Sequence, residues 1–148
     1  MSKSLSLFML AVVFITLVII SFIIGPPTAH SQATSITIDW TSPGDDGVVG
    51  TASLYEMRYS TVNPDTTSIT AMNSWWSAAT VVTGMPLPLI AGTAQSKVVV
   101  GTFPSGANYY FVIKTCDEVP NCSSYSNVAV KFIPDTLPPA RIVDLRSR

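Results

Sequence analysis

The stretch SITIDWTSPGDDGVVGTASLYEMRYS, residues 35–60, decides the fold of this chain. Apolar side chains occupy every second position at both of its ends. An alternation of period two predicts β-strands that bury one face and leave the other in water. Between the ends, Pro43–Gly47 predicts a turn, because proline fixes φ and glycine allows positive φ. The stretch therefore predicts two strands, 35–41 and 54–60, on either side of a turn.

The same alternation predicts further strands at 98–103, 109–114 and 128–132, each with one face toward the core. Short strands separated by turn residues are the pattern of a β-sandwich or a barrel. The apolar positions that mark the first and last of these three strands are Val98, Val100, Phe103, Val128, Val130 and Phe132.

The middle of the chain, 61–95, follows neither period cleanly. Ser68–Ala79 carries apolar side chains at spacings that one helical turn can use, so we expect a short helical turn or an irregular crossing there. Ala78–Val82 is expected to form a short edge strand. Pro86 and Pro88 argue against a strand directly after it, because proline cannot donate to a ladder of hydrogen bonds.

Residues 1–31 are predicted to be a secretory signal peptide. Lys3 provides a positive end, 7–24 is an apolar run, and Gly25–Pro27 ends any helix. Ala29–Ser31 then places small residues where a signal peptidase cuts.

An uncleaved membrane anchor is the alternative, because the apolar run is just long enough to span a bilayer. Membrane contact is then expected only through residues 5–24. In both cases the part after residue 31 is predicted to be secreted or displayed at the cell surface. A cysteine pair in that oxidising environment forms a disulfide by default.

Composition excludes several classes of function. The chain has 8 basic and 9 acidic side chains, and removal of Lys3 with 1–31 leaves 8 − 1 = 7 against 9, a net charge of −2. This balance provides no basic surface for nucleic acid. His30, the only histidine, lies in the predicted cleavage region. The exported part therefore lacks the histidine of Cys/His zinc sites and of Ser-His-Asp or Cys-His catalysis, and we expect no enzyme, metal or cofactor.

Four landmarks follow one another along the chain: Trp40, YEMRYS at 55–60, FPSGANYYF at 103–111 and SNVAVKF at 126–132. In this order they resemble the second, third, sixth and seventh strands of a fibronectin type III domain. The version that they resemble occurs in bacterial secreted multidomain proteins, and the resemblance covers residues 35–132.

The resemblance implies an all-β, immunoglobulin-like antiparallel β-sandwich over 32–134, preceded by the hydrophobic segment 1–31. Tyr109 matches the tyrosine corner of this family, whose hydroxyl bonds to nearby backbone. The side chains expected in the core are Trp40, Tyr55, Tyr59, Phe103, Tyr109 and Phe111.

Two features depart from the family pattern. The usual first strand is short or missing, because only three residues separate the predicted cut from the strand that begins at Ser35. Residues 135–148, DTLPPARIVDLRSR, resemble a linker and the first strand of a second, truncated domain. A flexible polar tail is the alternative. Arg141–Leu145 is a candidate to fill the vacant first-strand position, in this molecule or in a neighbour.

Cys116 and Cys122, the two cysteines of the chain, flank the loop 117–121. In the proposed fold they lie at the two ends of the connection between the sixth and seventh strands, so we predict a structural disulfide. A redox site of the Cys-x-x-Cys type is excluded by the spacing.

Trp75 and Trp76 are adjacent, so in an extended chain they face opposite ways. One of them, with Tyr110 and Tyr125, is a candidate platform for a sugar or a peptide. The alternative is that these rings cover the core.

The carboxylates in the turns are interpreted as solvated groups. Calcium requires six or more oxygens from a defined loop, and the sequence has no alternating Asp-x-Asp-x-Asp pattern. The residues in question are Asp45, Asp46, Asp117 and Glu118.

We therefore expect a non-catalytic extracellular module that acts as a spacer or as a weak protein-binding or adhesion domain of a larger secreted protein. Its expected partners are other domains of the same chain and an extracellular protein or polysaccharide. An accessory domain of a secreted hydrolase and a carbohydrate-binding module are the alternatives.

Overall fold

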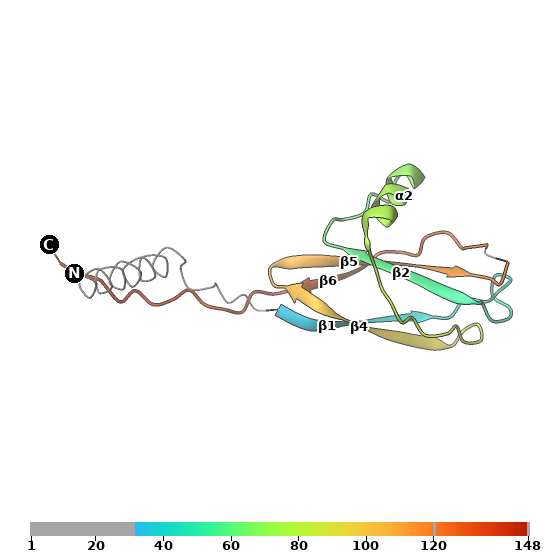
Figure 1. Ribbon diagram of the computed structural model, residues 1–148, viewed down its shortest axis with the longest axis horizontal. Coiled ribbons are helices and arrows are strands. Elements are labelled where there is room, and N and C mark those ends of the chain that lie inside the picture. Colours follow the sequence, from blue (N-terminus) through green and yellow to red (C-terminus); the bar gives the residue numbers. More distant parts are fainter. Residues whose placement is uncertain (1–31, 120, 148) are drawn as a thin grey trace, which may run out of the picture.

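The computed structural model describes residues 32–119 and 121–147, so the predicted signal peptide or anchor lies outside the described residues. The described chain folds into two antiparallel sheets that face each other (Figure 1). One sheet pairs β1 (Gln32–Thr41) with β4 (Ala94–Pro104). The other has the order β3-β2-β5-β6, with β3 (Thr80–Val81), β2 (Leu54–Ser60), β5 (Ala107–Cys116) and β6 (Ala129–Ile133). This arrangement confirms the predicted antiparallel β-sandwich.

The core between the sheets is built by the alternation that the sequence predicts. Met57 and Phe111 point inward from the larger sheet, and Phe103 points inward from the smaller one. Tyr59 lies 5.6 Å from Phe103 and 5.4 Å from Phe111 between ring centroids, and Phe103 lies 5.1 Å from Tyr109. Aromatic pairs at these distances add favourable ring contacts to the burial of apolar area.

Tyr109 makes the expected hydrogen bond to nearby backbone. Its hydroxyl donates to the carbonyl of Pro104 at 3.2 Å, across the turn that joins β4 to β5. Gly106 has φ = +77° in that turn, a backbone conformation that residues other than glycine rarely adopt. The ring therefore fixes the crossing between the sheets.

A second, smaller core lies on the outer face of the larger sheet, beneath α2 (Ile69–Ala78) (Figure 1). Ser68 caps the helix, and its Oγ accepts from the backbone N–H of Ala71 at 3.4 Å. The predicted helical segment is thus confirmed and is longer than one turn. The buried residues of this core are Met72, Trp75, Trp76, Ala79 and Val112.

In parts of β4 and β6, the apolar side chains that were expected in the core lie on the exposed face instead. Val98 and Val100 are 50 % and 80 % exposed, and Val99 between them is buried against the core. Residues that lie opposite each other in a ladder share a face, and Val99 is opposite the buried Ile36. The neighbouring strand therefore decides which face of an apolar run is buried.

The same correction applies to β6. Val130 is 56 % exposed and lies opposite Tyr110 on the outer face, and Phe132 on the same face is 52 % exposed. Ala129 and Ile133 point toward the core instead.

The edges of the sheets partly follow the sequence. The short edge strand β3 is confirmed, and 82–93 contains no strand. β1 begins at Gln32, earlier than expected, and in the described part of the chain it pairs only with β4. The tail 134–147 contains no helix or strand, so Arg141–Leu145 does not pair with β1 of its own molecule. Within the described ranges, no helix has the length and apolar character needed to span a membrane.

Candidate functional site

The two ends of the sandwich are different. Gln32, where β1 begins, pairs with Pro104, and the carbonyl of Ile133, where β6 ends, accepts from Gly106 N–H at 2.7 Å. The chain thus enters and leaves the sandwich at the same end, which we call the attachment end (Figure 1). The opposite end, the loop end, is formed by the connections 42–53, 82–93 and 117–128.

Backbone hydrogen bonds join the first two of these loops. Ser42 N–H donates to the carbonyl of Thr93 at 2.8 Å, and Gly92 N–H donates back to Ser42 at 2.9 Å. Ala91 N–H donates to the carbonyl of Gly50 at 3.2 Å. The two loops therefore form one connected surface.

Gln95, near the start of β4, holds the same region through its side chain. Its Oε1 accepts from the hydroxyl of Tyr55 at 2.8 Å, from the backbone N–H of Leu89 at 3.1 Å and from the hydroxyl of Ser42. Its Nε2 donates to the carbonyl of Leu87 at 2.9 Å. Ser42 is 2 % exposed, so this network satisfies polar groups that burial would otherwise destabilise.

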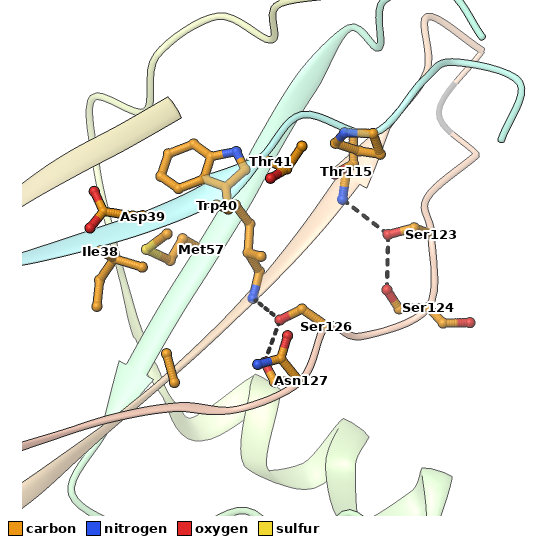
Figure 2. A pocket seen from close by; sticks show the side chains of 13 residues that line it. Ile38, Asp39, Trp40, Thr41, Met57, Thr115, Ser123, Ser124, Ser126 and Asn127 are labelled. Carbon is orange, nitrogen blue, oxygen red and sulfur yellow. Dashed lines mark hydrogen bonds between the residues drawn. The ribbon is translucent and has the colours of Figure 1, made fainter. Parts of the chain in front are cut away.

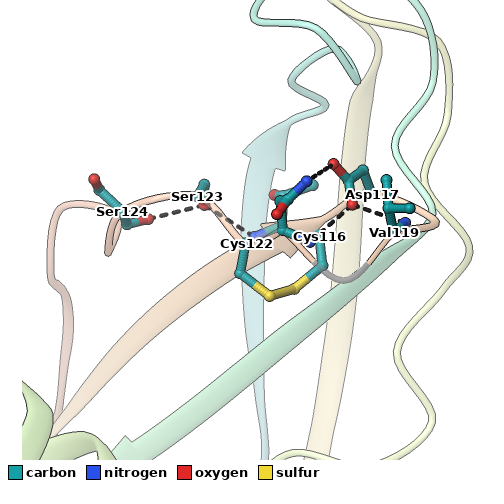
Figure 3. The surroundings of a disulfide bond; sticks show 8 residues. Cys116, Asp117, Val119, Cys122, Ser123 and Ser124 are labelled. Carbon is teal, nitrogen blue, oxygen red and sulfur yellow. Dashed lines mark hydrogen bonds between the residues drawn. A yellow bond between two sulfur atoms is a disulfide. The ribbon is translucent and has the colours of Figure 1, made fainter.

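The third loop is closed by the predicted disulfide between Cys116 and Cys122, which is confirmed (Figure 3). Inside the loop, the carboxylate of Asp117 accepts from the backbone N–H groups of Asn121 at 2.8 Å and Val119 at 3.0 Å. These bonds, Asn121 first, lower the pKa of Asp117 below its usual 3.8. The disulfide and the Asp117 carboxylate thus connect the described residues on the two sides of this loop.

Aliphatic side chains project from all three loops. A single exposed apolar residue is ordinary, but here each of the three loops carries at least one. These side chains and their exposed fractions are Val48 85 %, Val49 68 %, Leu87 80 %, Ile90 67 % and Val119 64 %.

Four carboxylates lie among these aliphatic groups. Burial raises the pKa of Asp45 above 3.8, and the negative charges of Glu118, Asp46 and Asp117 raise it further. One oxygen of Asp45 is shielded from water and has no hydrogen-bond partner among the described residues. The described part of the chain holds no group of three or more His, Cys, Asp or Glu that suits a metal ion. The loop end is thus both apolar and negatively charged.

The predicted aromatic platform is not formed. Trp75 and Trp76 are residues of α2 and are only 7 % and 8 % exposed, and Trp75 Nε1 donates to the carbonyl of Val62 at 2.7 Å. Tyr110 and Tyr125 pack against the same small core. The four rings do gather, but they cover the sheet instead of offering a free face. In a helix, adjacent side chains are separated by about 100°, so both indoles can turn toward the sheet.

Charged groups close this small core from outside. The guanidinium of Arg58 lies 4.9 Å from the Trp76 ring centroid and donates to the Trp76 carbonyl at 2.8 Å. Lys114 lies 5.2 Å from the Tyr125 ring, whose hydroxyl donates to Asn73 at 2.7 Å. These contacts place a cation beside the Trp76 ring and another beside the Tyr125 ring.

A groove of about 380 Å³ runs along β1 near the loop end (Figure 2). Ile38 and Trp40 form one wall, and Ser126 forms part of the other. Trp40 packs edge-on against Tyr55 at 5.2 Å, as a core residue should, but its Nε1–H is buried without a partner among the described residues.

The exposed aliphatic groups were missed by sequence reasoning because each lies in a segment that was read only as a turn. A signal was present: Val48 and Val49 stand between glycines, and Leu87, Leu89 and Ile90 follow prolines. Apolar residues inside turn-rich segments have no sheet face to occupy, so they are candidates for exposure.

Comparisons with protein-family models, with curated proteins and with solved structures find no match to this chain. The class that the fold defines is a disulfide-containing antiparallel β-sandwich.

Proposed function

We propose that this protein is an exported, non-catalytic binding module of the fibronectin type III kind, which belongs to a larger secreted protein and recognises a protein partner through its loop end. The order of the strands, the corner at Tyr109 and the inward side of Trp40 support the family assignment. The disulfide suits the predicted extracellular location.

One observation favours a binding module over a spacer between domains. The chain enters at Gln32 and leaves at Ile133, both at the attachment end. A spacer that links domains in series enters at one end and leaves at the other. A module held at one end instead presents its loops away from the rest of the chain, where recognition residues of sandwich domains commonly lie.

The chemistry of the loop end indicates the kind of partner. Exposed Val48, Leu87 and Ile90 provide apolar contact, and Asp46 and Glu118 provide negative charge beside it. A protein surface that combines Lys or Arg with aliphatic or aromatic side chains is complementary to both. The charges mainly speed association and select the partner, so binding should weaken as salt rises.

The test is a selection from a displayed library of random peptides on the purified chain. Enriched peptides should combine basic with apolar residues and should lose about tenfold or more in affinity on the double variant Val48→Ser, Val49→Ser. The matched control is Val130→Ser with Phe132→Ser, which removes two exposed apolar groups from the outer sheet face and should leave affinity unchanged. Equal binding to both variants, or enriched peptides without basic residues, would contradict the proposal.

A further inference from the structure

The two-stranded sheet has two outer edges, and only one of them is covered. Beside β4, Lys97 Nζ donates to the carbonyl of Gly84 at 2.6 Å, and Gln95 Nε2 donates to that of Leu87 at 2.9 Å, so the segment 82–93 lies along this edge. The outer edge of β1 pairs with no described residue. An open edge presents a row of free N–H and C=O groups that another strand can bind.

The groove in Figure 2 lies along this open edge. Its far wall is fixed, because the hydroxyls of Ser123 and Ser126 accept from the backbone N–H groups of Thr115 and Ile113 at 3.1 and 3.0 Å. On the β1 side, the buried Nε1–H of Trp40 lacks an acceptor. The open edge of β1 and the recess beside it thus lie at the same place.

The tail after β6 has the character of a strand but forms none. Ile142, Val143 and Leu145 are 77 %, 79 % and 89 % exposed. Pro134, Pro138 and Pro139 precede them in the sequence and favour an extended chain without internal hydrogen bonds. The tail runs away from the sandwich, beyond the attachment end (Figure 1).

The direction of the tail determines whether it can pair antiparallel with β1 of its own molecule or with β1 of a second copy. It leaves the sandwich where β1 begins, so a tail folded back on its own molecule would run parallel to β1. A second copy placed in line, with its loop end toward this attachment end, receives the tail antiparallel to its β1. The 14 residues of 134–147 extend to about 46 Å at 3.3 Å per residue, enough to reach and follow a ten-residue strand.

We propose that Arg141–Leu145 of one copy adds as an antiparallel strand to the outer edge of β1 in a second copy. Val143 and Leu145 share one face of that strand and enter the groove beside Trp40. Because each copy donates a tail and receives one, the contact is head-to-tail and the assembly is open-ended.

The test is sedimentation velocity of the purified chain over a range of concentrations. The wild type should form dimers and longer species as concentration rises. Val143→Pro removes an amide of the added strand and should weaken association at least tenfold, and Ser147→Pro, the matched control outside the strand, should not. Both positions are exposed, so neither change should disturb the fold. A monomer at all concentrations, or equal association of the two variants, overturns the proposal.

Hydrogen exchange identifies the surface. Amides of Gln32–Thr41 and Ile142–Leu145 should gain protection together as concentration rises in the wild type and not in Val143→Pro. A synthetic peptide of residues 140–147 should restore protection of β1 in that variant. Protection that is independent of concentration would show that another segment of the same molecule covers β1, and would overturn the proposal.

Discussion

Between the sheets, Phe103, Phe111 and Met57 are at most 2 % exposed, whereas at the loop end Val48 and Leu87 are 85 % and 80 % exposed. Apolar side chains are common in both regions, but only the first region is held together by burying them. The loop end is held by directional contacts: a disulfide, the side chain of Gln95 and the carboxylate of Asp117. Its exposed aliphatic groups therefore contribute little buried apolar area to the fold.

The largest effect is expected in the core. Phe103→Ala leaves a cavity between the sheets and should lower the free energy of unfolding by about 3–5 kcal/mol. Urea denaturation measures it. A loss similar to that of an exposed residue such as Phe132→Ala would contradict the description of Phe103 as a central core residue.

The disulfide should contribute the next largest effect. Replacing both Cys116 and Cys122 by Ser should lower the free energy of unfolding by about 2 kcal/mol, because a short closed loop constrains the unfolded chain. Native-state hydrogen exchange should show faster exchange in 117–121 and little local change around Phe111. Equal acceleration in both places would mean that the loop end and the core are not separable.

A substitution of Gln95 tests the hydrogen-bond network around its side chain. Gln95→Leu keeps the bulk of the side chain but leaves Tyr55 and Ser42 without their common acceptor, so unfolding should become easier by roughly 1–2 kcal/mol. Thermal denaturation measures the change. Gln95→Glu, which retains an acceptor, is the control and should be milder than Gln95→Leu; the reverse order would contradict the network.

The smallest effect is the dependence on pH. The pKa of Asp117 is lowered in the folded chain, so its carboxylate stabilises the fold above the unfolded pKa, and this contribution disappears as pH falls through the folded pKa. The pKa of Asp45 is raised, so its ionisation destabilises the fold as pH rises from the unfolded through the folded value. Asp117→Asn should therefore weaken the protein at neutral pH and Asp45→Asn should strengthen it. Urea midpoints at acidic and neutral pH compare them, and shifts of the same sign would refute the assignment.

Much of the fold follows from local patterns. The strands around Trp40, Tyr55–Tyr59 and Tyr109–Phe111 were predicted with the correct inward faces, as were the helical segment and the disulfide. These features depend on period, on turn chemistry and on the presence of two cysteines, all of which are written along the chain.

The candidate site was predicted poorly for a physical reason. Either Trp75 or Trp76 was a candidate for a platform, with covering of the core as the alternative, and α2 turns both toward the sheet. Val130 and Phe132 were expected inside, but their pairing with β5 places them outside. In each case burial depends on a neighbouring element that the local pattern does not contain.

By itself the sequence determined the two facing layers, because alternation, glycine and proline act over a few residues. Only the tertiary structure decided that β1 begins and β6 ends at one end of the sandwich, that the loops 42–53 and 82–93 meet at the other, and that the outer edge of β1 pairs with no described residue. These properties depend on which strands become neighbours, and that choice is made by contacts between residues far apart in the chain.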